Sequence, residues 1–159
     1  MKITVIAVGK IKEKFFEQAV AEYGKRLGSY CKLEIVQVAD EKPPNRLDGA
    51  LAEQVKEKEG ARILSHVKDG AYVIALAVEG KMMSSEELAD KIDSLGIGGV
   101  SHIQFIIGGS LGLSEAVMRR ADFSLSFSRM TFPHQLMRVV LLVQIYRSYR
   151  ISLGMPYHK

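Results

Sequence analysis

The stretch Ala71–Val78, AYVIALAV, is the longest apolar run of the sequence. Eight residues are far too few to span a bilayer, which takes about 20. An unbroken apolar run is typical of a strand that is buried on both faces of a parallel sheet, whereas a half-exposed strand alternates apolar and polar residues. The run therefore predicts an α/β protein.

The segments on either side of this run alternate between strand and helix patterns. Four further strands are expected, at 2–9, 31–39, 102–109 and 123–128. Five helices are expected at 12–27, 47–67, from Ser84 onward, 114–121 and 133–152. Glu87 follows Ser84 by three residues, as in a capping box. Gly60 is expected to weaken or bend its helix, and Pro43-Pro44 marks a loop. This order predicts an α/β fold with a mostly parallel sheet flanked by helices, in a single domain spanning 1–159.

The composition indicates an ordinary globular protein. A chain of 159 residues is long enough for one well-formed core, and 25% charged residues is a typical content. Cys31 has no partner for an internal disulfide, which fits a reducing compartment. The start, MKITVIAVGK, lacks the pattern of a signal peptide. We expect a cytoplasmic protein without a membrane partner.

Positive charge gathers at the C-terminal end. The net charge is +4, and residues 129–159 contain five basic side chains and no acid. They are Arg129, Arg138, Arg147, Arg150 and Lys159. These side chains could simply form the solvated face of a helix. They could equally contact phosphate groups, whose geometry suits arginine.

The expected final helix, 133–152, is apolar on two sides. One stripe consists of Leu136, Val139, Val140 and Val143, and another of Met137, Leu141 and Ile145. A helix of this kind must be buried on more than one side. A second copy of the chain could cover one side, which predicts a homodimer. A deeply buried helix in a monomer is the alternative.

The stretch Ile106–Glu115, IIGGSLGLSE, places three glycines at the end of a strand. It matches neither the G-x-G-x-x-G dinucleotide motif nor a phosphate-binding P-loop. Scattered histidines and one cysteine argue against a metal site. In open α/β sheets, loops at the carboxyl ends of strands bind ligands, and the loops after Leu76 and between Ser126 and His134 could contribute. By the residues alone, a ligand-binding loop and a structural turn are both possible.

Three motifs together resemble one family. They are IIGGSLGLS, SFSRMTFPHQLMRVVLLVQIYRSYRI and the terminal PYHK. They are similar to the ribosomal RNA large subunit methyltransferase H family, which belongs to the SPOUT class of S-adenosylmethionine-dependent enzymes. The resemblance covers essentially the whole chain. It implies a C-terminal trefoil knot and a homodimer with cofactor sites at its interface. The implied reaction is methylation at N3 of a pseudouridine in a large-subunit rRNA hairpin of the assembled ribosome.

The resemblance also implies roles for particular residues. Its cofactor positions fall on Leu76, Gly108, Phe127, Ser128, Arg129, Met130, Thr131 and Phe132, with no metal. Many members carry Asp after the leucine of the first loop, whereas this chain has Ala77. An Asp-dependent contact is therefore absent, while main-chain binding at Leu76 would be unaffected.

The tail carries the candidates for chemistry. His158 could accept the N3 proton, Tyr157 could stack on the base, and Arg147 could stabilise the developing anion or hold a phosphate. Without the resemblance, His158 would be taken as a solvated side chain. Arg138 is either structural or phosphate-binding, and Arg147 and Arg150 share a helix face that could contact RNA. A non-catalytic RNA- or ribosome-binding protein is the main alternative, and a small-molecule nucleotide enzyme is disfavoured by the missing motifs.

Overall fold

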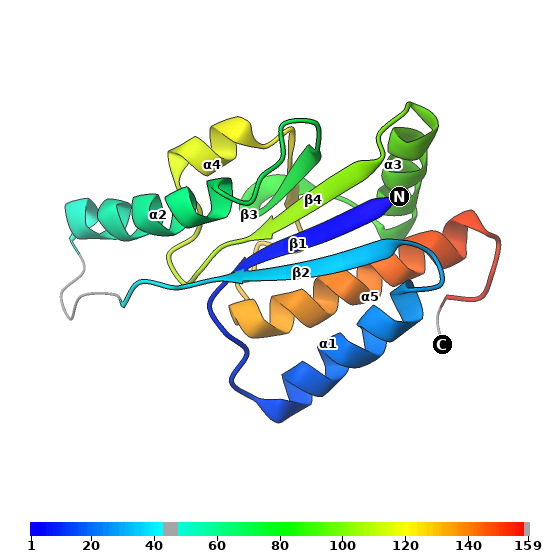
Figure 1. The fold of residues 1–159 in the computed structure, drawn as a ribbon, viewed down its shortest axis with the longest axis horizontal. Helices are drawn as coiled ribbons and strands as arrows, with labels where there is room; N and C mark the ends of the chain where they lie inside the picture. Colours follow the sequence, from blue (N-terminus) through cyan, green and yellow to red (C-terminus); the bar gives the residue numbers. More distant parts are fainter. Residues whose placement is uncertain (43–47, 158–159) are drawn as a thin grey trace.

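The structure, a computed structural model, describes residues 1–42 and 48–157. The expected Pro43-Pro44 loop and His158 lie outside the described residues. The strands are β1 (Lys2–Val8), β2 (Lys32–Val38), β3 (Tyr72–Met82), β4 (His102–Ile107) and β5 (Phe123–Ser126). The helices are α1 (Lys14–Leu27), α2 (Gly49–Leu64), α3 (Ser85–Ile97), α4 (Glu115–Arg120) and α5 (His134–Ser152). The strict alternation of strands and helices along the chain is confirmed (Figure 1).

The strands form one sheet in the order β2-β1-β4-β3-β5, and every neighbouring pair is parallel. The carboxyl ends of the strands consequently meet at one edge of the sheet. The predicted α/β class with a mostly parallel sheet is therefore confirmed.

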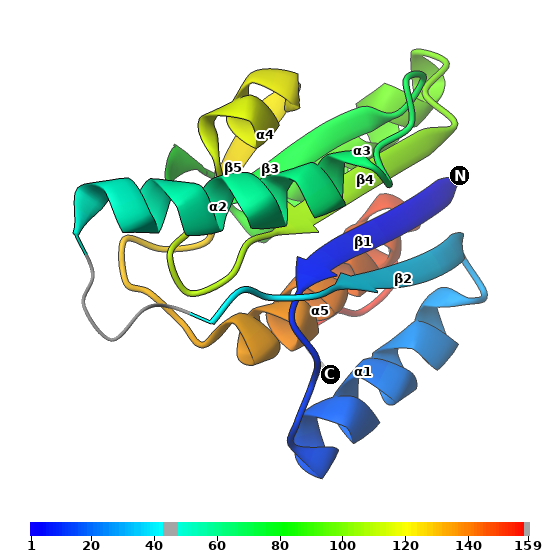
Figure 2. The same ribbon diagram turned by 60° about the vertical axis from the view of Figure 1, so that its left-hand side comes forward.

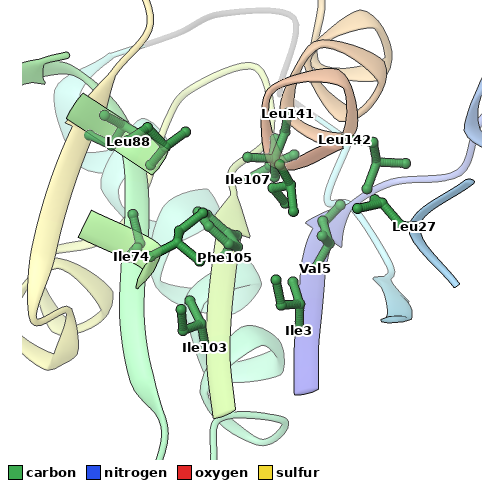
Figure 3. Packing of buried hydrophobic residues seen from close by; sticks show 14 residues of the cluster. Ile3, Val5, Leu27, Ile74, Leu88, Ile103, Phe105, Ile107, Leu141 and Leu142 are labelled. Atoms are coloured by element: carbon green, nitrogen blue, oxygen red, sulfur yellow. The ribbon is translucent and has the colours of Figure 1, made fainter. Parts of the chain in front are cut away.

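Helices cover both faces of the sheet. Helices α1, α3 and α5 lie on one face, and α2 and α4 lie on the other (Figure 2). The larger core cluster joins α1, α3 and α5 to the sheet through Leu27, Leu88 and Leu141 (Figure 3). The smaller cluster joins α2 and α4 to the opposite face through Ile63 and Val117. Such a two-sided core suits strands that are apolar on both faces.

The apolar run that predicts the fold becomes β3. Ile74 belongs to the larger core cluster and Val73 to the smaller one, so this strand is buried on both faces as expected. The strand continues beyond the run to Met82, with an irregular register against β5 between Leu76 and Lys81. Val78 is 45% exposed, which corrects the expectation that the whole run is buried. The irregularity turns this end of β3 away from the core.

The helix boundaries follow the capping signals of the sequence. Asp48, Ser84 and Ser114 each accept a hydrogen bond from a backbone N–H of the first helical turn. The capping box of Ser84 and Glu87 is complete. α1 begins at Lys14, two residues later than predicted.

The expected weakening or bend at Gly60 does not interrupt α2, which is helical from Gly49 to Leu64. A Cβ at Gly60 would collide with the Ser114 hydroxyl at the start of α4. The glycine thus allows close packing of α2 on α4.

The two apolar stripes of α5 have different surroundings. Leu141 and Ile145 are fully buried, and Met137 packs against the same cluster. The other stripe, Leu136, Val139, Val140 and Val143, is half-buried and belongs to neither core cluster. One chain therefore covers one side of α5 and leaves an apolar stripe without core contacts. Within the described ranges, no helix is both long and apolar enough to cross a membrane.

Candidate active site

A cavity of about 740 Å³ lies at the carboxyl edge of the sheet, where three chain segments meet. The segments are 76–79 within β3, 107–113 from the last residue of β4 onward, and 125–128 with 130–134 from the end of β5 to the start of α5. α2, α4 and α5 add Lys56, Met118 and Met137. The volume falls in the range of about 300–1,000 Å³ that is typical of small-molecule sites. The three loops singled out in the sequence thus surround one cavity.

The structure brings seven of the eight predicted cofactor residues to this cavity. The lining includes Leu76, Gly108, Phe127, Ser128, Met130, Thr131 and Phe132. Arg129 is exposed and is absent from the lining, although its neighbours on both sides take part. Ala77, which stands where many relatives have Asp, also contributes to the wall.

The glycine loop forms a tight turn that exposes backbone to the cavity. The Gly112 N–H donates to the Gly109 carbonyl at 3.1 Å, and Gly112 has a φ of +89°. A Cβ at Gly108 would lie 2.9 Å from Leu113 Cδ2 and 3.0 Å from the Gly112 carbonyl oxygen. A side chain at Gly108 would therefore require Leu113 and the Gly112 backbone to shift. The alternatives of a structural turn and a ligand loop are compatible, because the turn itself lines the cavity.

The segment after β5 holds its shape through short-range hydrogen bonds. The Ser126 hydroxyl donates to the Ser128 carbonyl at 3.1 Å, and the Met130 N–H donates to the Ser128 hydroxyl at 2.9 Å. Met130 and Phe132 remain 75% and 43% exposed, so two large apolar side chains stand at the rim of the cavity.

Few charged side chains reach the cavity wall. Lys56 from α2 and Glu79 from β3 supply one charge of each sign. Lys56 Nζ also pairs with Glu53 Oε1 at 2.7 Å. His134, at the start of α5, lines the cavity, and burial together with the nearby Arg138 guanidinium lowers its pKa. Its imidazole is thereby kept neutral near pH 7.

Arg138 has a structural role. Its Nη2 donates to the carbonyl oxygens of Val8 at 2.9 Å and Gly9 at 2.7 Å, and the residue is 1% exposed. Burial lowers the pKa of its guanidinium. Because Val8 is the last residue of β1 and Gly9 follows it, Arg138 connects the end of that strand to the helix that carries His134. The sequence had left structural and phosphate-binding roles open, and the geometry favours the first.

Glu59 is a buried residue beside the site that the sequence motifs did not indicate. This residue of α2 is 4% exposed, and its Oε2 accepts a hydrogen bond from the Glu41 N–H at 3.0 Å. Its carboxylate lies against Gly109 of the glycine loop. Burial is the main cause that raises its pKa. A signal was present in the sequence, because Glu59 stands midway between Val55 and Ile63 at the four-residue spacing of a buried stripe.

The predicted catalytic tail lies outside this cavity in a single chain. The Tyr157 hydroxyl donates to Glu86 Oε1 at 2.7 Å, at the start of α3, and this bond raises the pKa of Tyr157. Arg147 is close enough to Tyr157 to counteract that rise. Arg147 follows Met137 by ten residues of α5, or about 15 Å at 1.5 Å per residue. Neither Tyr157 nor Arg147 contributes to the cavity lining. The third candidate, His158, lies outside the described residues.

Residues 1–42 and 48–157 contain no candidate metal site. No group of three His, Cys, Asp or Glu side chains in these ranges could hold an ion.

Comparisons with known proteins agree with this arrangement. Residues 1–158 match the profile of a family described as "Predicted SPOUT methyltransferase". Proteins named "Ribosomal RNA large subunit methyltransferase H" are similar over all 159 residues and over their own full length. The identity is 64% in Bifidobacterium adolescentis, 60% in Alkaliphilus oremlandii and 59% in Bacillus pumilus.

A solved structure supports the fold alone. It is "The structure of a probable methylase family protein from Haemophilus influenzae Rd KW20", with a TM-score of 0.51 and 10% identity. The match covers 96% of this chain and 66% of that one. By the family match and the full-length relatives, the chain belongs to the SPOUT methyltransferase family and is a methyltransferase.

Proposed function

We propose that this protein transfers a methyl group from S-adenosylmethionine to N3 of a pseudouridine in a large-subunit rRNA hairpin of the assembled ribosome. The observation that carries the proposal is the cavity that Leu76, Gly108 and the segment from Phe127 to Phe132 surround at the carboxyl edge of the sheet. The rRNA substrate is supported by the names of relatives with up to 64% identity. A ribosomal substrate in turn suits a cytoplasmic protein.

The chemistry of the cavity fits the cofactor. S-adenosylmethionine combines an adenine, a positively charged sulfonium and a zwitterionic amino-acid end. Phe127 and Phe132 offer aromatic faces, which attract cations and stack on adenine. Lys56 and Glu79 provide charges of both signs for the amino-acid end. The backbone of the glycine loop offers donors and acceptors, and a side chain at Gly108 would displace Leu113 and the Gly112 backbone.

Methyl transfer requires that the base is oriented toward the methyl group and that its N3 loses a proton. When bound, the cofactor supplies the methyl group, which leaves its sulfonium sulfur for the N3 nitrogen. We propose that neutral His158 accepts the N3 proton and that Arg147 stabilises the resulting anion. Tyr157 would stack on the base and hold it in line with the methyl group.

A homodimer would complete the site. In one chain, Tyr157 lies by Glu86, and Arg147 is about 15 Å along α5 from the cavity. The stripe Leu136, Val139, Val140 and Val143 is half-buried and outside the core clusters. We propose that this stripe packs on a second copy and that the tail of each chain serves the cavity of the other. Each cofactor site would then lie at the interface.

Two further features belong to the proposal. Residues 1–159 would act as one domain, since the described strands join one sheet. The C-terminal part would be threaded as a trefoil knot, a proposal supported by the family match. When the chain is pulled from both ends, a knot should leave it shorter than its full contour length.

Calorimetric titration with S-adenosylmethionine, followed by methyl transfer to ribosomes that lack the modification, tests the proposal. Saturable binding and incorporation of labelled methyl at a pseudouridine are expected. Ribosome binding without cofactor binding would instead indicate the alternative of a non-catalytic ribosome-binding protein.

A further inference from the structure

Arg150 stands in the last turn of α5, before the chain leaves the helix and leads into the tail. The sequence groups it with Arg147 as a possible RNA contact. In the structure its guanidinium is directed to groups of its own chain. Nε donates to the Pro156 carbonyl oxygen at 2.9 Å. Nη1 donates to the Tyr30 hydroxyl at 3.3 Å and lies 3.6 Å from the Met155 sulfur.

An aromatic platform lies next to Arg150 and consists of Tyr30, Tyr146 and Tyr149. Tyr30 stacks on Tyr149 with ring centroids 5.7 Å apart and an interplanar angle of 11°. Tyr30 also meets the edge of Tyr146 at 6.0 Å, and the Arg150 guanidinium lies 5.8 Å from the Tyr146 ring centroid. Tyr30 precedes β2, whereas the other two tyrosines belong to α5. Arg150 thus joins the tail to a platform built by two separate parts of the fold.

A backbone bond adds to this attachment. The Met155 N–H donates to the Arg150 carbonyl oxygen at 2.8 Å, and Gly154, with a φ of +68°, reverses the chain just before it. The tail therefore folds back toward α5, and Arg150 holds both its backbone and its side chains. Pro156, which accepts the Nε bond, directly precedes Tyr157.

We propose that Arg150 is a positioning residue for methyl transfer, which fixes the direction in which the tail presents Tyr157. The inference rests on the proposed function, because the tail is there the source of the catalytic groups. A planar guanidinium can donate to the Pro156 carbonyl and the Tyr30 hydroxyl at once, while a lysine ammonium is a point charge without that fork. Misplacement of reacting groups by about 1 Å can lower a rate by roughly a hundredfold.

Arg26 offers a matched control. Its guanidinium lies 5.8 Å from the same Tyr146 ring and 4.9 Å from Tyr23, and it pairs with Glu22 at 3.1 Å. Both arginines therefore contact the aromatic platform, but the contacts to Pro156 and Met155 are those of Arg150. Replacing Arg26 removes a cation from the platform and leaves the attachment of the tail in place. The two effects can therefore be measured separately.

The test compares Arg150→Ala, Arg150→Lys, Tyr30→Phe and Arg26→Ala in the full-length protein, with S-adenosylmethionine and unmodified ribosomes. For Arg150→Ala we expect kcat to fall about tenfold or more, with the cofactor Kd and the KM for ribosomes unchanged. Arg150→Lys should restore little. Tyr30→Phe should cause a smaller loss that is not additive with Arg150→Ala. Arg26→Ala should keep the kcat of the unaltered protein. Hydrogen exchange at the Met155 amide should accelerate in Arg150→Ala.

A phosphate-binding role would give the opposite pattern. Arg150→Lys would then retain most activity, and Arg150→Ala would raise KM and reduce the salt slope of ribosome binding by about one. That pattern, or an unchanged kcat in Arg150→Ala, would overturn the inference. Failure of the unaltered protein to transfer methyl groups would overturn the proposed function instead.

Discussion

Nη2 of Arg138 donates to the carbonyl oxygen of Gly9 at 2.7 Å, across 129 residues of sequence. The bond connects the carboxyl end of β1 to the helix that begins beside the cavity. Arg138 is 1% exposed, and its Nε and Nη1 have no hydrogen-bond partner among the described residues. A buried cation is therefore held by backbone carbonyls, so the end of β1 depends on it.

Arg138→Ala should lower the free energy of unfolding by about 2–4 kcal/mol, because two buried carbonyl oxygens lose a charged donor and a cavity remains. Urea denaturation followed by circular dichroism measures this change. Arg119, which is exposed on α4, is the control. Arg119→Ala should change stability by less than about 0.5 kcal/mol. Equal stabilities of the two variants would contradict the structural role of Arg138.

Gly108→Ala should weaken binding of S-adenosylmethionine by about tenfold or more, because its Cβ would displace Leu113 and Gly112 and deform the loop. Calorimetric titration gives the Kd, and circular dichroism checks the fold. Gly70→Ala is the matched control, since a Cβ at Gly70 meets nothing within 4 Å. Unchanged affinity in Gly108→Ala would remove the glycine loop from the proposed cofactor site.

Glu59→Gln should flatten the pH dependence of stability. The raised pKa of Glu59 means that its carboxyl binds a proton more tightly in the folded protein than in the unfolded one. Its stabilising contribution is complete below its ordinary value of 4.5 and is lost as the pH rises through the raised pKa. Glutamine keeps an acceptor for the Glu41 N–H and does not titrate.

Unfolding free energies from about pH 4 to pH 8 test this effect of Glu59. The unaltered protein should lose stability relative to Glu59→Gln as the pH rises. Glu57→Gln, at an exposed position of the same helix, is the matched control for removal of a carboxylate. A parallel pH dependence of the unaltered protein and Glu59→Gln would show that Glu59 does not titrate as inferred.

Val140→Glu should convert the proposed dimer into monomers, because a charge in the centre of the half-buried stripe of α5 cannot be buried without a partner. Light scattering after size exclusion gives the mass. Methyl transfer should be lost with the dimer. Ile97→Glu is the control, since Ile97 is 81% exposed at the end of α3. A dimeric Val140→Glu variant would locate the interface elsewhere.

Deletion of Tyr157, His158 and Lys159 should abolish methyl transfer and leave the Kd for S-adenosylmethionine unchanged, because none of the tail candidates within the described residues lines the cavity. Labelled-methyl incorporation into ribosomes and calorimetry give the two quantities. Full activity of the truncated protein would exclude the tail as the source of the proton acceptor.

The sequence by itself determined the local features. The apolar run at β3, the capping box of Ser84 and Glu87 and the order of strands and helices are consequences of short-range patterns. Hydrophobic periodicity and side-chain capping act within a few residues, so the chain alone reveals them. The rule that open α/β sheets bind ligands at the carboxyl ends of their strands also indicated the three loops that surround the cavity, and the resemblance then named their ligand.

The tertiary structure decided what depends on distant partners. Arg138 could be assigned a structural role only when Val8 and Gly9 were found beside it. Arg150 changed from a possible RNA contact to a residue attached to Tyr30 and Pro156. Hydrogen bonds between residues more than 100 positions apart leave no periodic trace in the sequence. The packing of the helices on the parallel sheet creates them, because it brings the start of α5 to the carboxyl end of β1 and the end of α5 to the segment before β2.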